Sequence, residues 1–239
     1  MFGRRAAAKH SGKEEAEKPF WISFADLMSA LMVMFLLAMS VALLSVTKTV
    51  NEREVKEEEH RRDIALILTR FEEAAAKFPG IKVDKSRQVI DFGQRAQFNY
   101  NRYTLNVDQE RLLREFVPEI LVRANDELGR RILKRIVVEG FTDRSGSYLS
   151  NLNLSLQRSQ IVLCSMFKTQ LSAERPLTEN EKHQIRALFL VGGYSFNSAR
   201  ESDAESRRVE MRLEFLGIGD LPRPATLPAD SSDFGKCAL

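Results

Sequence analysis

Residues 20–46 read FWISFADLMSALMVMFLLAMSVALLSV, an apolar run of 27 residues that contains one ionisable side chain, Asp26. As a helix, this run would be about 40 Å long, enough to cross a hydrocarbon layer of roughly 30 Å with some tilt. A carboxyl group inside such a helix is costly, so it usually faces a protein partner or a water path. A desolvated carboxyl group can also stay neutral and then release its proton. Asp26 is therefore a candidate for ion transfer; the alternative is that it only pairs with a partner helix for assembly.

The basic residues that decide the orientation lie in the polar segment before this run, residues 1–19. They are Arg4, Arg5, Lys9, Lys13 and Lys18, against three glutamates. Because lysines and arginines in short flanks stay in the cytoplasm, we expect a cytoplasmic N-terminus, with everything after Thr47 on the far side. A cleaved signal peptide is the alternative, but its apolar core would be shorter and uncharged, with a small-residue cleavage site after it. The sequence therefore predicts a membrane helix at residues 20–46.

The remaining chain is long enough for one domain with a core, since 239 residues leave roughly 190 outside the membrane. The 36 basic and 33 acidic residues give a net charge of +3, which indicates no nucleic-acid partner. His10, His60 and His183 are scattered and are not grouped with cysteines, so we expect no metal site. The sequence has no phosphate-binding glycine loop and no nucleophile beside a base. We therefore expect no cofactor and no enzymatic activity.

A densely charged segment follows the apolar run. Glu57 with Arg61 and Glu58 with Arg62 have the i,i+4 spacing of helical ion pairs. Apolar side chains between Ile64 and Phe78 then repeat at helical spacing until Pro79-Gly80 ends the element. We interpret residues 47–80 as a charged helical linker, a plain stalk, and place the domain at residues 81–216. The tail, residues 217–239, has three prolines and no periodicity, which predicts loop structure.

The domain alternates between strand and helix patterns, which predicts an α/β (α+β) fold in the order β-α-β-α-β-β. A helix begins at Val107–Asp108, with Asp108 as the expected N-cap. Its apolar face carries Leu112, Phe116 and Ile120. The strands are expected at 88–92, 135–140, 187–191 and 208–215, the long second helix at about 149–171, and a shorter helix near 178–185.

The apolar run also carries a family signature. The string WISFADLMSALMVMFLLAM, residues 21–39, resembles the membrane helix of the B-type stator subunits, the family of flagellar MotB. That helix has an aromatic residue, then Ala-Asp, then methionines and small residues. The resemblance implies that Asp26 is the proton-carrying residue, near the cytoplasmic end of the helix.

A second string resembles a different family motif. Residues 139–159 read EGFTDRSGSYLSNLNLSLQRS, similar to the core motif of the OmpA-like peptidoglycan-binding domain. The resemblance implies that Asp143 and Arg158 clamp the amine and the carboxylate of the diaminopimelate side chain in the wall peptide. An acceptor-only group and a fixed donor fork suit such a zwitterion. The further candidates that the resemblance adds are Thr142, Asn151, Asn153, Ser155, Arg207 and Arg208. The alternative is a structural salt bridge between Asp143 and Arg158 with no ligand.

Two positions depart from the OmpA-like pattern. Ser159 stands where the family usually has alanine, a small change, and Ser206 stands in place of an asparagine that helps to shape the ligand pocket. The two cysteines, Cys164 and Cys237, agree with an oxidising compartment. They can form a disulfide that ties the tail to the domain or remain two free thiols, and the sequence leaves both open.

The combination of the two halves is more specific than either alone. The chain is identified as a member of the B-type stator family, and its helix string and short linker resemble the ZorB-type subunits of the Zorya anti-phage defence system more than flagellar MotB. The resemblance implies a single-pass protein of the bacterial inner membrane with a periplasmic domain. It also implies a homodimer surrounded by a polytopic A-type subunit, in a five-to-two assembly, with peptidoglycan as a further partner. The alternatives are a flagellar stator subunit and a passive peptidoglycan anchor.

Overall fold

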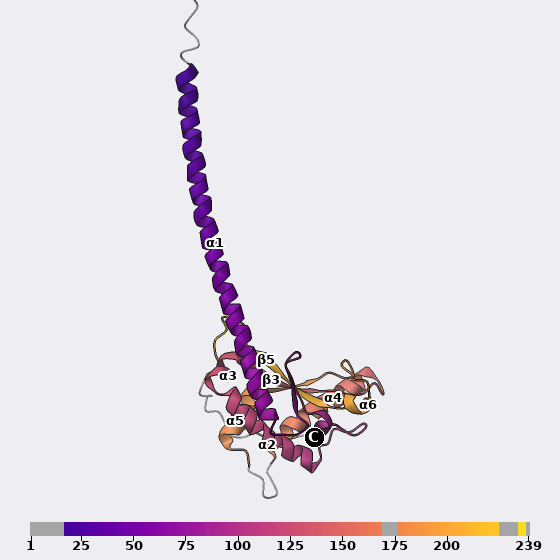
Figure 1. Ribbon diagram of the computed structural model, residues 1–239. Helices are drawn as coiled ribbons and strands as arrows, with labels where there is room; N and C mark the ends of the chain where they lie inside the picture. Colours follow the sequence, from indigo (N-terminus) through magenta and orange to yellow (C-terminus); the bar gives the residue numbers. More distant parts are fainter. Residues whose placement is uncertain (1–16, 169–175, 225–233, 238–239) are drawn as a thin grey trace, which may run out of the picture. The chain divides into compact units, whose positions relative to one another are not determined.

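The computed structural model describes residues 17–168, 176–224 and 234–237 (Figure 1). The predicted N-terminal segment, the end of the long helix near Leu171 and much of the tail lie outside the described residues. The chain divides into two compact units between Lys56 and Glu57.

The first unit is the N-terminal part of helix α1, Glu17–Ala75, a helix of 59 residues (Figure 1). Its large apolar side chains from Trp21 to Val46 are exposed, and its mean hydropathy reaches 2.5. Within the described residues, α1 is the one helix long and apolar enough to cross a membrane. Hydroxyl groups in it, such as those of Ser40 and Thr47, donate to the carbonyl oxygen four residues earlier. These polar side chains are thereby satisfied within the helix.

The last turns of α1 belong to the core of the second unit. Ile67 and Phe71 are completely buried there, and Phe78 packs edge-on against Phe116 at 5.3 Å between ring centroids. An ion pair between Arg70 Nη1 and Asp126 Oδ2, 2.6 Å apart, fixes the same stretch. The compact unit thus begins before residue 81, where the sequence places the start of the domain. The end of the predicted linker is a core helix rather than a plain stalk, because its apolar positions share one face and that face is covered.

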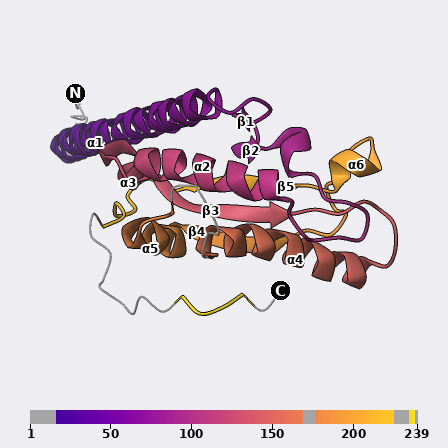
Figure 2. The ribbon, with the colours of Figure 1, turned by 90° about the horizontal axis from the view of Figure 1, so that it is seen from below.

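Five strands form one mixed sheet in the order β1-β2-β5-β3-β4. Their bounds are β1 Lys82–Asp84, β2 Val89–Asp91, β3 Leu133–Gly140, β4 Phe189–Gly193 and β5 Val209–Phe215. Strands β3 and β4 are parallel, whereas the other neighbours are antiparallel. The predicted α/β class is confirmed. The sequence did not predict β1, which is only three residues long and pairs with β2 as a hairpin (Figure 2).

Besides the end of α1, the described helices of this unit are α2 Val107–Ala124, α3 Glu127–Ile132, α4 Tyr148–Phe167, α5 Glu179–Leu188 and the short α6 Asp203–Ser206, with a 3-10 helix η1 at Gly93–Ala96. Helix α2 begins with a capping box between Asn106 and Gln109, so its N-cap is Asn106 and not Asp108. Ser147 caps α4, and Thr178 caps α5 together with Glu181. The short elements α3, α6 and η1 do not appear in the sequence analysis.

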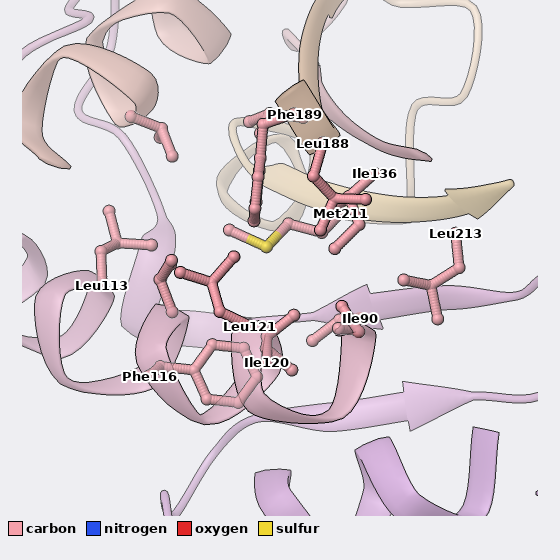
Figure 3. Packing of buried hydrophobic residues seen from close by; sticks show 14 of the residues in the cluster. Ile90, Leu113, Phe116, Ile120, Leu121, Ile136, Leu188, Phe189, Met211 and Leu213 are labelled. Carbon is pink, nitrogen blue, oxygen red and sulfur yellow. The ribbon is translucent and has the colours of Figure 1, made fainter. Parts of the chain in front are cut away.

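One face of the sheet carries the core. Ile136 of β3 and Met211 of β5 point toward Phe116 and Ile120 of α2, with Leu188 from the end of α5 beside them (Figure 3). Side chains alternate along a strand, so the opposite face carries charged residues of β3 and β5, such as Glu139 and Arg212.

Two glycines bring helix α4 unusually close to the sheet. A Cβ atom on Gly140 would lie 1.9 Å from the carbonyl oxygen of Ser155, and one on Gly193 would lie 2.8 Å from the Leu156 nitrogen. Helix α4 packs along both β3 and β4 (Figure 2). This close approach places the polar residues of α4 next to the end of β3, where the candidate site lies.

Candidate functional site

Four segments far apart in sequence meet at the carboxyl end of β3. They are the residues that follow β3, the part of α4 up to Arg158, the residues that precede β5, and the turn Asn99–Arg102 between η1 and α2. Arg158 of α4 and Asp143 after β3 are the charged residues at the centre, and both are buried. The sequence separations of these contacts reach 109 residues, so only the folded domain assembles the site.

Arg158 is fully enclosed and is held by three main-chain carbonyl groups. Its Nη1 donates to Phe141 O at 2.7 Å, its Nε to Arg102 O at 2.9 Å and its Nη2 to Asn99 O at 3.3 Å. The guanidinium also lies over the Phe98 ring, 5.0 Å from the ring centroid. Burial lowers the pKa of Arg158 to about 10, although the nearby Asp143 carboxylate opposes this shift. The side chain is therefore a charged donor at neutral pH.

Asp143 is 4% exposed and is held in the ionised form. Arg207 Nη1 lies 2.9 Å from its Oδ2, and the backbone amide of Ser145 donates to its Oδ1 at 3.0 Å. Burial alone would raise the pKa of Asp143, but the hydrogen bonds from Arg207 and Ser145 outweigh burial and hold this pKa below its ordinary value of 3.8.

Within the described chain, no ion pair joins Asp143 to Arg158. The direct salt bridge that the sequence offers as an alternative is absent, because Asp143 pairs with Arg207 and Arg158 binds carbonyl groups instead. The two charged groups therefore sit side by side with opposite signs, each held by other partners. A zwitterionic ligand is complementary to this pair, because its positive group can face Asp143 and its negative group can face Arg158.

The two adjacent arginines differ in role. Arg207 bridges the site, because it also donates from Nε to Phe98 O at 3.1 Å. Arg208 points elsewhere: its Nε donates to Glu210 at 2.8 Å, and its guanidinium covers the Phe141 ring at 4.3 Å. Arg208 therefore stabilises the residues that line the site and does not face its centre.

The polar residues of α4 divide between the loop after β3 and the helix surface. Asn151 is buried and donates from Nδ2 to Ser145 O at 2.7 Å, which holds the loop that carries Asp143. Ser155 accepts from the Ser195 amide at 3.0 Å and joins α4 to the chain after β4. Asn153 is exposed, so the structure does not bring it to the site. The helical period puts Asn153 on the face opposite Asn151.

Thr142 carries an unsatisfied polar atom next to Asp143. Thr142 is 1% exposed, and its Oγ1 has no hydrogen-bond partner among the described residues. A buried hydroxyl without a partner costs free energy, so such a group indicates a position that a ligand or water fills. Ser206, at the position where the OmpA-like pattern has asparagine, is used locally: its Oγ accepts from the Arg200 amide at 2.8 Å.

The sequence did not predict that the turn Asn99–Arg102 is part of the site. Its contribution is two carbonyl oxygens, which any residue type can supply, so no side-chain pattern could have revealed it. The apolar residue Phe98 sits directly before the turn, with its ring under the Arg158 guanidinium, and is the one available signal.

Asp26 lies on the exposed surface of the first unit. A hydroxyl hydrogen bond links Ser29 Oγ to the Asp26 main-chain carbonyl at 2.9 Å, but within the described residues no side chain pairs with the Asp26 carboxylate. In the same residues, no cluster of three or more histidine, cysteine, aspartate or glutamate side chains has the arrangement of a metal site.

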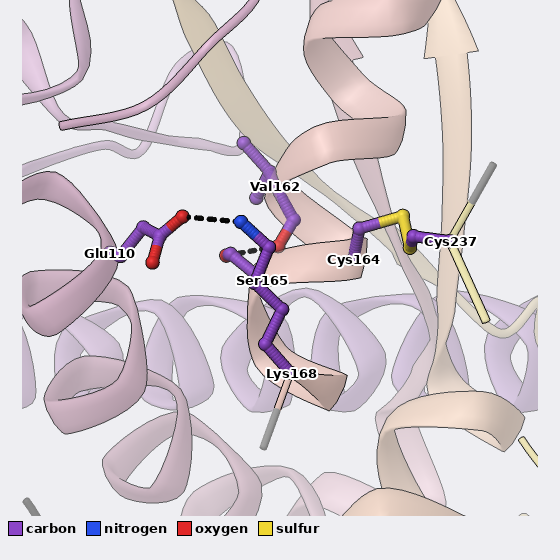
Figure 4. The surroundings of a disulfide bond; sticks show 6 residues. All are labelled: Glu110, Val162, Cys164, Ser165, Lys168 and Cys237. Atoms are coloured by element: carbon purple, nitrogen blue, oxygen red, sulfur yellow. Dashed lines mark hydrogen bonds and ion pairs between the residues drawn. A yellow bond between two sulfur atoms is a disulfide. The ribbon is translucent and has the colours of Figure 1, made fainter. Parts of the chain in front are cut away.

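The two cysteines are joined in the structure. Cys164 of α4 and Cys237 of the tail form a disulfide, with 5.9 Å between their Cα atoms (Figure 4). Beside this bond, Lys168 pairs with Glu110 of α2 at 2.8 Å (Figure 4). The disulfide and this ion pair fix the end of α4 to the tail and to α2.

Comparison with known proteins found relatives for both halves of the chain. Residues 4–57 match the family described as the membrane MotB of the proton-channel complex MotA/MotB. A membrane-length helix with this match, followed by the α/β domain, defines the class of B-type stator subunits. The chain is also 44% identical over 221 residues to the Zorya protein ZorB of Escherichia coli O139:H28 (strain E24377A / ETEC), covering 92% of this chain and 90% of that protein. The chain therefore belongs to the ZorB family.

Solved structures similar to the domain have lower identity. The OmpA-like domain of FopA1 from Francisella tularensis subsp. tularensis SCHU S4 is 20% identical, covers 54% of this chain and 75% of its own, and has a TM-score of 0.35. A putative MotB-like protein from Desulfovibrio vulgaris is 20% identical, covers 69% of this chain and 98% of its own, and has a TM-score of 0.39.

Proposed function

We propose that this chain is the wall-anchored subunit of a proton-driven membrane motor that acts in anti-phage defence. The observation that carries this proposal is the extent of the ZorB match, which spans 92% of the chain and so includes both the helix with Asp26 and the domain with Asp143 and Arg158. A motor needs an ion site and a fixed reference for torque, and the two units of this chain offer one each.

The membrane unit supplies the ion site. Two copies pair through α1, with their N-termini in the cytoplasm, and a pentamer of a polytopic A-type subunit surrounds them. A proton from the periplasm neutralises Asp26 and leaves to the cytoplasm, which changes how well this helix face tolerates apolar contact. Each charge that crosses supplies about 2.3 kcal/mol per 100 mV of membrane potential, and this work drives the ring around the dimer. The absence of a partner for Asp26 among the described residues supports this arrangement.

The periplasmic unit supplies the fixed reference by binding peptidoglycan. The Asp143 carboxylate accepts the amine of a diaminopimelate side chain, and the Arg158 guanidinium donates to its carboxylate. Both groups are ionised at neutral pH, as their shifted pKa values require. The unsatisfied Thr142 hydroxyl offers a further hydrogen bond to the ligand.

A wall-binding assay tests the anchor. Full-length protein in detergent is mixed with purified peptidoglycan, and the wild type is compared with Asp143→Asn, which keeps the shape of the side chain and loses its charge. We expect binding to weaken at least about tenfold, because a buried charged partner is lost. Asp108→Asn is the matched control, since Asp108 is 86% exposed in its side chain and lies outside the site. Equal binding by wild type and Asp143→Asn would contradict the proposed anchor.

A further inference from the structure

Arg158 does not present its donors to solvent, although the proposed function requires them for a ligand. The residue is 0% exposed, and Nε, Nη1 and Nη2 are all engaged by carbonyl oxygens. Because the guanidinium is completely buried, a carboxylate can reach it only if a group that covers it moves away. The inference below rests on the proposed wall binding and concerns what is displaced.

The three carbonyl groups around Arg158 are not equivalent. Phe141 directly follows β3, and its amide is bonded to Arg208 O at 2.9 Å, so this acceptor belongs to the framework. Asn99 and Arg102 instead belong to one turn, closed by the Arg102 amide on Asn99 O at 3.1 Å. All four residues of this turn are exposed. The acceptors of Nε and Nη2 thus belong to an exposed turn, whereas the acceptor of Nη1 belongs to the buried framework.

The hydrogen bonds that attach the turn to the rest of the domain come from Arg158, and Leu105, three residues beyond the turn, packs against the hydrophobic core. Across residues 99–105, which are all described, the hydrogen bonds to the rest of the domain are the two from Arg158 Nε and Nη2. The flanks are fixed independently: the Phe98 amide donates to Arg207 O at 2.8 Å, and the capping box of Asn106 fixes the start of α2. A segment with anchored ends and one central attachment can open without disturbing its neighbours.

The two donors that the turn occupies are the pair that suits a carboxylate. In a planar guanidinium, Nε–H and one Nη2–H point the same way, so they bind two carboxylate oxygens in parallel. The same domain contains an example of this geometry. Arg212 donates from Nε and Nη2 to the two carboxylate oxygens of Glu139, at 2.5 and 3.0 Å. At Arg158, the carbonyl oxygens of the turn take the places of those two oxygens.

We propose that the turn Asn99–Arg102 is a lid latched by Arg158, and that a wall-peptide carboxylate opens the lid by replacing its two carbonyl oxygens. Nη1 keeps its bond to Phe141 O throughout, so the guanidinium stays oriented while the lid moves. Thr142 Oγ1, buried without a partner, is the second group that the ligand satisfies. The closed structure is therefore the unloaded anchor, and the population of the open lid sets its apparent affinity.

Asn101 provides a substitution that acts on the lid alone. Its φ of 52° lies in the left-handed region, its side chain is exposed, and its amide makes no hydrogen bond in the described chain. Proline cannot adopt a positive φ, so Asn101→Pro breaks the turn, and the backbone N–H that it removes makes no hydrogen bond in the described chain. Glycine adopts this conformation freely, so Asn101→Gly keeps the turn and is the matched control.

The test measures the binding of a soluble muropeptide that carries meso-diaminopimelate to the full chain in detergent. We expect Asn101→Pro to lower the Kd at least about fivefold, mainly through faster association, and Asn101→Gly to stay within about twofold of wild type. Arg158→Lys keeps the charge but loses the paired donors, so it should abolish binding. Equal Kd values for Asn101→Pro and Asn101→Gly, or full binding by Arg158→Lys, would overturn the lid.

The wild type gives a measurement that does not depend on a variant that folds. In stopped-flow mixing, the observed association rate should level off with muropeptide concentration, because opening becomes limiting; a linear rise throughout would count against a lid. The two proposals fail differently. If the wild type binds and only the Asn101 and rate results fail, the lid is overturned and the anchor stands. If the wild type itself does not bind, the wall-binding proposal falls and the lid falls with it.

Discussion

The two carboxylates of interest, Asp26 and Asp143, lie in opposite settings. Asp26 is on an exposed apolar helix and has no side-chain partner in the described residues, whereas Asp143 is buried and receives hydrogen bonds from Arg207 and Ser145. In the second unit a buried carboxylate is held by donors of the same unit, whereas the Asp26 carboxylate of the first unit has no such donor among the described residues. In the proposed function, Asp26 serves ion transfer and Asp143 serves ligand binding.

The largest expected loss of stability distinguishes the buried end of α1, which belongs to the domain core, from its exposed apolar part. Phe71→Ala should destabilise the domain by about 3–5 kcal/mol, because Phe71 is completely buried in the core. Phe35→Ala is the same change at a side chain that is 65% exposed, and it should leave domain stability unchanged. Thermal unfolding followed by circular dichroism in detergent measures both. Equal effects would mean that α1 is one uniform element.

The next largest effect concerns how much the disulfide contributes to the stability of the second unit. Cys237→Ser should lower the free energy of unfolding by about 2–4 kcal/mol, because the disulfide to Cys164 constrains the unfolded chain. Reductant should destabilise the wild type by a similar amount and should not affect Cys237→Ser. An unchanged melting temperature on reduction would show that the tail contributes no stability through this bond.

A smaller effect tests the pairing that holds Asp143. Arg207→Ala should cost about 1–3 kcal/mol at neutral pH, because it leaves a buried carboxylate with one donor fewer. The folded-state pKa of Asp143 is lowered, so its stabilising contribution is present above the unfolded pKa and is lost as pH falls through the folded one. The difference between wild type and Arg207→Ala should therefore shrink as pH falls below about 4.

A matched surface pair provides the control for this change. Arg61→Ala removes a partner of Glu58, but the Arg61 side chain is 74% exposed, so we expect a change in unfolding free energy within about 0.5 kcal/mol. Chemical denaturation across pH measures both variants. An Arg207→Ala variant as stable as Arg61→Ala would show that Asp143 is not held as the structure indicates.

The sequence predicted side chains better than it predicted their partners. The resemblance to the OmpA-like motif implied that Asp143 and Arg158 share one site, and the helix period marked the apolar face of α1 near Phe71. They could not show that this face is covered, because periodicity reports amphipathicity and not what packs against it. The acceptors of Arg158 are main-chain carbonyl groups, and the Arg207 that holds Asp143 is 64 residues away in sequence. Contacts of both kinds come from the fold, so a local motif cannot contain them.

Helix starts show the same limit on a smaller scale. Asp108 has the residue type of an N-cap, yet Asn106 takes that role because Gln109 completes its capping box. Similarly, Asn153 fits the spacing of the family motif as well as Asn151, but the helix turns it outward.

The most direct test of the account is a phage-protection assay with Asp26→Asn in cells that also express the A-type subunit. Asn keeps the shape of Asp26 and cannot carry a proton. The account predicts that protection is lost while the complex still copurifies with its A-type subunit and peptidoglycan binding stays at the wild-type level. Full protection by Asp26→Asn would contradict it, and would leave this chain as a passive wall anchor.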